Sequence, residues 1–67
     1  MLTSDQINEL VIKADILQKE NPSLRKGQAL MNILAEMDMP LYESVTGTEA
    51  DCFYNDKLIP KFFEYLI

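Results

Sequence analysis

The first twenty residues carry apolar side chains at the spacing of an amphipathic α-helix. Five of them recur every three or four positions and form one stripe: Ile7, Leu10, Val11, Ala14 and Leu17. Thr3 and Gln6 have the spacing of a capping box, in which each side chain binds the backbone N–H of the other residue. Asn21-Pro22 is typical of a helix end. The pattern therefore predicts a helix from Thr3 to about Lys19.

Ile12 and Ile16 lie one turn apart on this helix but off its apolar stripe, and they form a second, smaller apolar patch. Either the patch packs against another element of the same fold, or it is exposed and binds a partner. Because the chain is small, we expect internal packing. We keep both residues as candidate contact residues in case the patch is exposed.

Residues 21–38 predict a second helix with a wide apolar face. Asn21 is a candidate N-cap with Pro22 in the first turn, and Ser23 is the alternative cap. The apolar face consists of Leu24, Gly27, Leu30, Met31, Ile33, Leu34 and Met37. A face this wide needs neighbours on two sides, so we expect the central helix. Since glycine weakens a helix, Gly27 predicts the close approach of another backbone or of a bulky ring.

A polar row follows the other side of the second helix and consists of Arg25, Gln28, Asn32 and Glu36. The row is either a solvated surface or a set of side chains that hydrogen-bond a neighbouring loop. Arginine offers a planar guanidinium that suits a carboxylate, and glutamine and asparagine can pair with backbone groups. Both interpretations are open from the sequence.

The C-terminal half predicts a short helix, a loop and a last helix. Asp38 and Gly47 are candidate caps at the two ends of the short helix. Residues 59–66 form the last helix, with a proline in its first turn. The loop has no clear helix pattern, and a short strand at 52–54 is the alternative. We expect an all-α fold with a single domain over residues 1–67: a small three- to four-helix bundle with an ordered loop packed on the central helix.

Size, composition and charge limit the classes of function that we expect for the protein. The 67 residues are 48% hydrophobic and 25% charged, which is typical of a small globular domain. The formal net charge is −5, and the six acidic residues from Glu36 to Asp56 have no Lys or Arg among them. We therefore expect no direct binding to nucleic acid, which needs clustered basic residues. We expect no membrane span and no signal peptide, and the single cysteine predicts a reducing, cytoplasmic setting.

The sequence offers no constellation of catalytic residues. It contains no histidine, and Cys52 has no base nearby in sequence, so we expect this thiol to be a small apolar filler. Glu49, Asp51, Asn55 and Asp56 are oxygen ligands in a short span, but they do not match the spacing of a calcium loop. We expect neither an enzyme nor a bound cofactor or metal ion.

Two blocks of the sequence, LRKGQALMN at 24–32 and DCFYND at 51–56, form a pattern of R-x-G-Q-x-L-x-N followed by D-x-F-Y-x-D. The pattern resembles that of short uncharacterised proteins from bacteria and from their phages or mobile elements. That family brings no known function with it. Cys52 stands where proline or leucine is more usual in the pattern, which speaks against a catalytic thiol.

The resemblance implies that the two blocks meet in the fold. We expect Arg25 to pair with Asp51 or Asp56. We also expect Phe53 and Tyr54 to cover the apolar side of the central helix near its glycine.

The function that we expect is that of a small intracellular protein–protein interaction module, such as a phage or mobile-element modulator of a host protein. One alternative is an acidic mimic of nucleic acid that inhibits a DNA- or RNA-binding protein. The other is a structural or self-assembling protein. We expect a protein partner for a chain that is a monomer or a weak homodimer. The candidate interaction residues are Ile12, Ile16, Arg25, Gln28, Asn32, Glu36, Glu43, Glu49, Asp51 and Tyr54.

Overall fold

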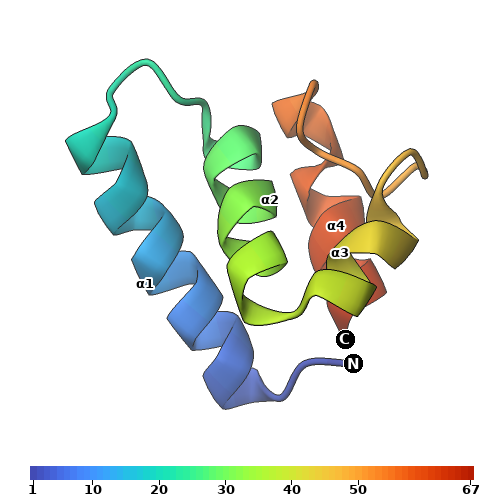
Figure 1. Ribbon diagram of the computed structural model, residues 1–67. Coiled ribbons are helices and arrows are strands. Elements are labelled where there is room, and N and C mark those ends of the chain that lie inside the picture. Colours follow the sequence, from blue (N-terminus) through green and yellow to red (C-terminus); the bar gives the residue numbers. More distant parts are fainter.

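Four α-helices and one short 3-10 helix form the chain in the computed structural model, which describes residues 1–67 (Figure 1). In chain order the elements are α1 (Ser4–Glu20), α2 (Lys26–Met37), α3 (Met39–Val45), the 3-10 helix η1 (Asp56–Leu58) and α4 (Ile59–Leu66). The predicted all-α fold is confirmed. The alternative of a short strand at 52–54 is wrong, because these residues form an irregular bend with no strand beside them to pair with.

The local signals at the two ends of α1 act as predicted. Gln6 N donates to Thr3 Oγ1 at 3.2 Å, and Thr3 N donates to Gln6 Oε1 at 2.8 Å, which completes the capping box. At the other end Asn21 N donates to Leu17 O at 2.9 Å and closes the last turn. The helix therefore ends at Glu20, one residue beyond the predicted end.

The start of α2 differs from the prediction by about one helical turn. Asn21, Pro22 and Ser23 belong to a turn that is closed by a bond from Leu24 N to Asn21 O at 2.9 Å, and the helix begins only at Lys26. The reason lies in the first backbone N–H groups of the helix, which need partners. Gln28 Oε1 accepts from Arg25 N at 2.9 Å, and Asp56 Oδ1 accepts from Gly27 N at 3.0 Å.

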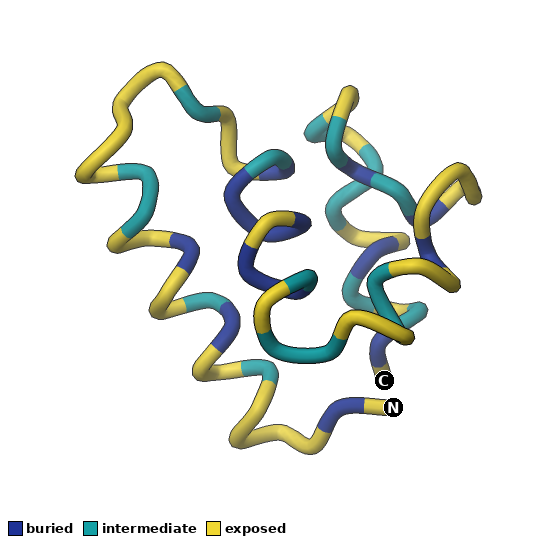
Figure 2. Tube along the Cα trace, viewed as in Figure 1, coloured by how far each residue is buried: buried dark blue, intermediate teal, exposed yellow.

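α2 is the central helix, as predicted. It packs against α1 on one side and against α3 on the other, and η1 lies against it as well. Its buried side chains are Ala29, Leu30, Met31, Ile33 and Leu34. α1 contributes Leu10 and Ala14 to the core, and α4 contributes Phe62 and Leu66 (Figure 2). Each large apolar side chain that leaves water contributes about 1.5–3 kcal/mol, so this cluster is the main source of stability.

The two ends of α3 also follow the local signals. Asp38 Oδ1 accepts from Leu41 N at 3.1 Å and caps the first turn. Gly47 has a φ of 79° just after the helix, in the left-handed region where glycine is strongly favoured. Both cap residues were predicted from the sequence.

α4 forms hydrogen bonds both with α3 and with the N-terminal segment before α1. Tyr65 Oη donates to Ser44 O at 3.3 Å, which connects α4 with α3. Leu2 N donates to Leu66 O at 3.1 Å, so the two termini lie together (Figure 1). None of the helices combines the length and the apolar character that crossing a membrane requires.

Candidate protein-interaction surface

The two sequence blocks meet at the start of α2, as the resemblance implies. Arg25 Nη2 donates to Phe53 O, and Arg25 Nε lies 3.8 Å from Asp56 Oδ1. The same Asp56 oxygen accepts from Gly27 N. Both ion-pair side chains are almost half exposed, so the charge attraction itself contributes at most about 1 kcal/mol. The hydrogen bonds and the packing of the loop account for the rest of its attachment.

Gly27 allows the loop to lie directly on α2. A methyl group at this position would overlap the backbone oxygen of Cys52 and would lie 2.7 Å from Asp56 Oδ1. The Cys52 thiol in turn donates to Gly27 O at 3.6 Å. The predicted close approach is therefore confirmed, and the approaching group is a backbone carbonyl rather than an aromatic ring.

Asp51 does not pair with Arg25, and both of its carboxylate oxygens accept hydrogen bonds from backbone groups near it in the chain. Its Oδ2 accepts from Gly47 N at 2.9 Å, and its Oδ1 accepts from Phe53 N at 3.0 Å. Both bonds close turns within the loop. Of the two carboxylates expected to pair with Arg25, the structure selects Asp56 and gives Asp51 a structural role.

The two loop aromatics have different environments, although we expected both to cover the central helix. Phe53 is partly buried and packs against the core. Tyr54 is 83% exposed, and its ring lies edge-on to Phe53 with 4.8 Å between the ring centroids. The prediction is wrong for Tyr54, because the backbone of Cys52 occupies the space over Gly27 and the Tyr54 ring lies in solvent.

Cys52 is fully buried in the core, which agrees with the predicted role of a small apolar filler. Burial raises the pKa of the Cys52 thiol from 9.0 to about 11, and the nearby carboxylates of Asp51 and Asp56 add to the rise. The thiol is therefore neutral near pH 7, and neutral thiols are poor nucleophiles.

We expect Cys52 to react with a thiol reagent at pH 8 at least about 100-fold more slowly in the native protein than in urea. The higher pKa, about 11, lowers the thiolate fraction at pH 8 by about that factor, and burial lowers the rate further. Because the folded-state pKa is the higher one, the native state should also lose stability as the pH rises from about 9 towards 11. Rates of reaction with 5,5′-dithiobis(2-nitrobenzoate), measured with and without urea, check the expected difference in thiol reactivity. Similar rates in both states would contradict it.

The second apolar patch of α1 is exposed. Ile12 and Ile16 are 59% and 52% exposed, and the outer side of α1 faces solvent along its length (Figure 2). The expectation of internal packing is wrong, because α3 and α4 lie on the far side of α2 and leave the outer side of α1 uncovered (Figure 1). The two side chains form a small apolar patch in contact with water, the alternative under which they stay candidate contact residues.

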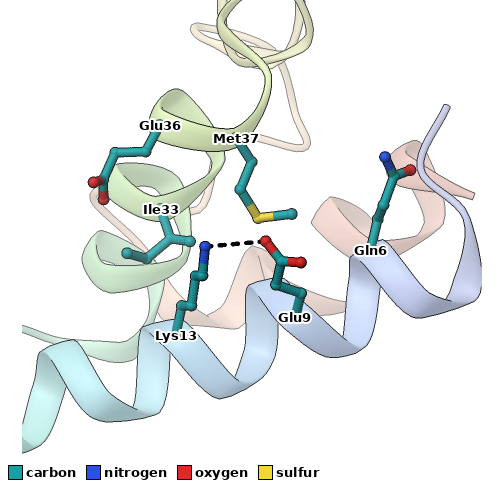
Figure 3. Close-up of a pocket in the computed structure, with 6 residues that line it drawn as sticks. All are labelled: Gln6, Glu9, Lys13, Ile33, Glu36 and Met37. Carbon is teal, nitrogen blue, oxygen red and sulfur yellow. Dashed lines mark ion pairs between the residues drawn. The ribbon is translucent and has the colours of Figure 1, made fainter.

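A groove runs between α1 and α2 next to this patch. Two neighbouring hollows form it, and both are lined by Lys13, Ile33 and Glu36. The remaining lining residues are Gln6, Glu9, Ile16, Leu17, Glu20 and Met37. Figure 3 shows Ile33 and Met37 pointing from α2 towards α1, with Glu36 at the outer edge. We use the name α1–α2 face for this groove together with Ile12.

The charges of the α1–α2 face are mainly negative. Lys13 Nζ lies 3.0 Å from Glu9 Oε2, an i,i+4 pair on the surface of α1 (Figure 3). Glu20 and Glu36 line the end of the groove around Ile16, and neither forms an ion pair in the fold. Sequence reasoning missed Glu9, Lys13 and Glu20, although the spacing of the first two is a recognisable signal.

The polar row on α2 is divided by the structure. Arg25 donates to Phe53 O, so the loop-binding interpretation holds for Arg25. Gln28 instead accepts from Arg25 N and caps its own helix. Asn32 and Glu36 are exposed and make no side-chain hydrogen bond, which agrees with a solvated surface. Of the four, only Glu36 lines the α1–α2 groove.

The acidic candidates do not gather on one surface. Glu36 lies at the groove, Glu43 is exposed on α3, and Glu49 Oε2 lies 3.5 Å from Lys61 Nζ. Asp51 is engaged within its loop. No group of three or more Cys, Asp or Glu side chains is placed to hold a metal ion.

Comparison of the chain with protein-family models, curated proteins and solved structures finds no match. The resemblance of the two sequence blocks to short bacterial and phage proteins therefore stays a prediction.

Proposed function

We propose that the protein is a small cytoplasmic interaction module that binds a partner protein through its α1–α2 face. The observation that carries the proposal is the exposure of Ile12 and Ile16 beside a groove that Leu17 and Ile33 line at the same end. When a partner covers apolar side chains that are exposed next to a concave surface, the removal of these side chains from water favours binding. The lone free thiol supports a reducing compartment, and a host protein is the partner that the phage-like resemblance favours.

The two alternatives have less support. A mimic of nucleic acid needs a continuous row of carboxylates, but the acidic candidates are distributed over three separate places, and Glu49 has a basic neighbour in Lys61. A symmetric dimer through the α1–α2 face would bring the same patch of both copies together. Glu20 and Glu36 of one copy would then approach those of the other, with only Lys13 to offset them.

We expect a double variant, Ile12→Ser with Ile16→Ser, to lose the partner while keeping the fold. The substitutions are on an exposed helix surface, so each should change the free energy of unfolding by no more than about 0.5 kcal/mol. A matched control is Met39→Ser with Ile67→Ser, which removes two other exposed apolar side chains. The three proteins serve as baits in lysate of cells that encode the chain, with quantitative mass spectrometry of the retained proteins.

The supporting result is a protein retained by the wild type and the control but lost from the Ile12/Ile16 variant. That protein, once purified, should bind the Ile12/Ile16 variant at least tenfold more weakly than the wild type. Equal recovery on all three baits would overturn the proposed function.

A further inference from the structure

We infer that the segment bound in the α1–α2 groove is a basic amphipathic helix of the partner protein, an inference that rests on the proposed function. The groove lies between two helices that run side by side (Figure 1), and its apolar lining comes from both. Ile16 and Leu17 belong to α1, and Ile33 and Met37 belong to α2. A groove between helices with apolar and charged side chains in its lining suits an amphipathic helix, which places its apolar side chains at i, i+3, i+4 and i+7.

The α1 side of the groove is long enough for a helix of about four turns, and the α2 side covers one turn of it, from Ile33 to Met37. Its lining extends along α1 from Gln6 to Glu20, which corresponds to roughly 21 Å at 1.5 Å per residue. A helical segment of about 14 residues spans the same distance. Such a segment can place one apolar side chain per turn over Met37, Ile33 and Ile16 in succession.

The charge of the groove selects the partner. Lys13, the one basic residue that lines the groove, is paired with Glu9. Glu20 and Glu36 form no ion pair, so the lining carries a net negative charge at the apolar end of the groove. A partner helix with Lys or Arg beside its apolar residues would place cations against both carboxylates. Complementary charges of this kind speed association and exclude acidic competitors. An acidic helix, or a second copy of this chain, would meet repulsion instead.

The test uses three synthetic peptides of 15 residues and the full protein. All three carry leucine at positions i, i+3, i+4 and i+7, which form one side of the helix. The positions that flank the leucines are lysine in the first peptide, glutamine in the second and glutamate in the third. Binding is measured by isothermal titration calorimetry, and the contact surface by methyl NMR shifts. We expect the lysine peptide to bind at least tenfold more tightly than the glutamate peptide and to shift the methyl signals of Ile16 and Ile33. Equal affinities, or shifts confined to other helices, would overturn the inference.

A matched pair of variants separates the groove from the overall charge of the chain. Glu36→Gln and Glu43→Gln remove one negative charge each from an exposed helix position, but only Glu36 lines the groove. We expect Glu36→Gln to lower the affinity for the lysine peptide threefold to tenfold. Glu43→Gln should change this affinity less than twofold. Equal weakening would show that net charge alone attracts the peptide, and would overturn the inference.

The inference and the proposed function fail in different ways. Suppose that a partner's binding depends on Ile12 and Ile16, but that the partner segment protected from hydrogen exchange in the complex is acidic or not helical. The inference then fails and the proposed function stands. If no partner depends on these residues, the proposed function fails. If the wild type sediments as a dimer that Ile16→Ser dissociates, a second copy occupies the face, and the inference is overturned.

Discussion

Gly27→Ala destabilises the folded protein by about 3 kcal/mol in our expectation, even though alanine is the better helix former. The added methyl group would overlap the Cys52 carbonyl oxygen, which is backbone and cannot rotate away. Relief requires the 51–56 loop to move off α2, which breaks the bond from Gly27 N to Asp56 and that from Arg25 to Phe53 O. Overpacking costs about 1–3 kcal/mol, and each lost hydrogen bond about 1 kcal/mol. The gain in helix propensity offsets at most about 1 kcal/mol of this loss.

Urea unfolding followed by circular dichroism measures the loss, and Gly47→Ala is the matched control. Gly47 has a positive φ of 79°, but a methyl group there meets no atom within 4 Å. The control should therefore lose only the strain of a left-handed alanine, about 1–2 kcal/mol. If Gly27→Ala unfolded at the same urea concentration as the wild type, the loop would not lie on α2 as described.

Phe62→Ala is expected to cost about 3–5 kcal/mol, which is the usual range for truncation of a buried phenylalanine. Phe62 is the largest fully buried side chain of the protein. Domains of fewer than about 70 residues are seldom more stable than about 3–5 kcal/mol in total. The variant should thus be largely unfolded at 25 °C, with a flat thermal profile by circular dichroism.

Phe63→Ala provides the comparison within the same helix. The two rings meet edge to face with 5.3 Å between their centroids, but Phe63 is only partly buried. Its truncation should cost on the order of 1–2 kcal/mol and leave a cooperative transition. Equal losses for the two variants would contradict the placement of Phe62 at the centre of the core.

The parts of the fold that the sequence predicted correctly depend on residues close together in the chain. The capping box of α1 joins residues three positions apart, and the same holds for the Asp38 cap of α3. The proline in the first turn of α4 and the left-handed glycine after α3 are also local constraints. Their energies are nearly independent of the rest of the fold, so a pattern of residue types is enough to locate them.

The start of α2 could not be placed in this way. Asn21-Pro22-Ser23 is a good local start signal, but the N–H of Gly27 binds Asp56, which is 29 residues further along the chain. The exposure of Tyr54 has a similar origin, since Cys52 occupies the space over Gly27. Contacts between distant residues decided both outcomes, and no local pattern carries that information.

The sequence by itself predicted an all-α fold, the approximate positions of its four α-helices, and a contact of Arg25 with Asp51 or Asp56. The choice of Asp56 came from the tertiary structure. The tertiary structure alone decided which surface is left open. Ile12 and Ile16 form an apolar patch in either case, but their burial depends on which side of α2 the later helices occupy. Since α3 and α4 pack on the side away from α1, the α1–α2 face remains uncovered, with Glu20 and Glu36 beside it.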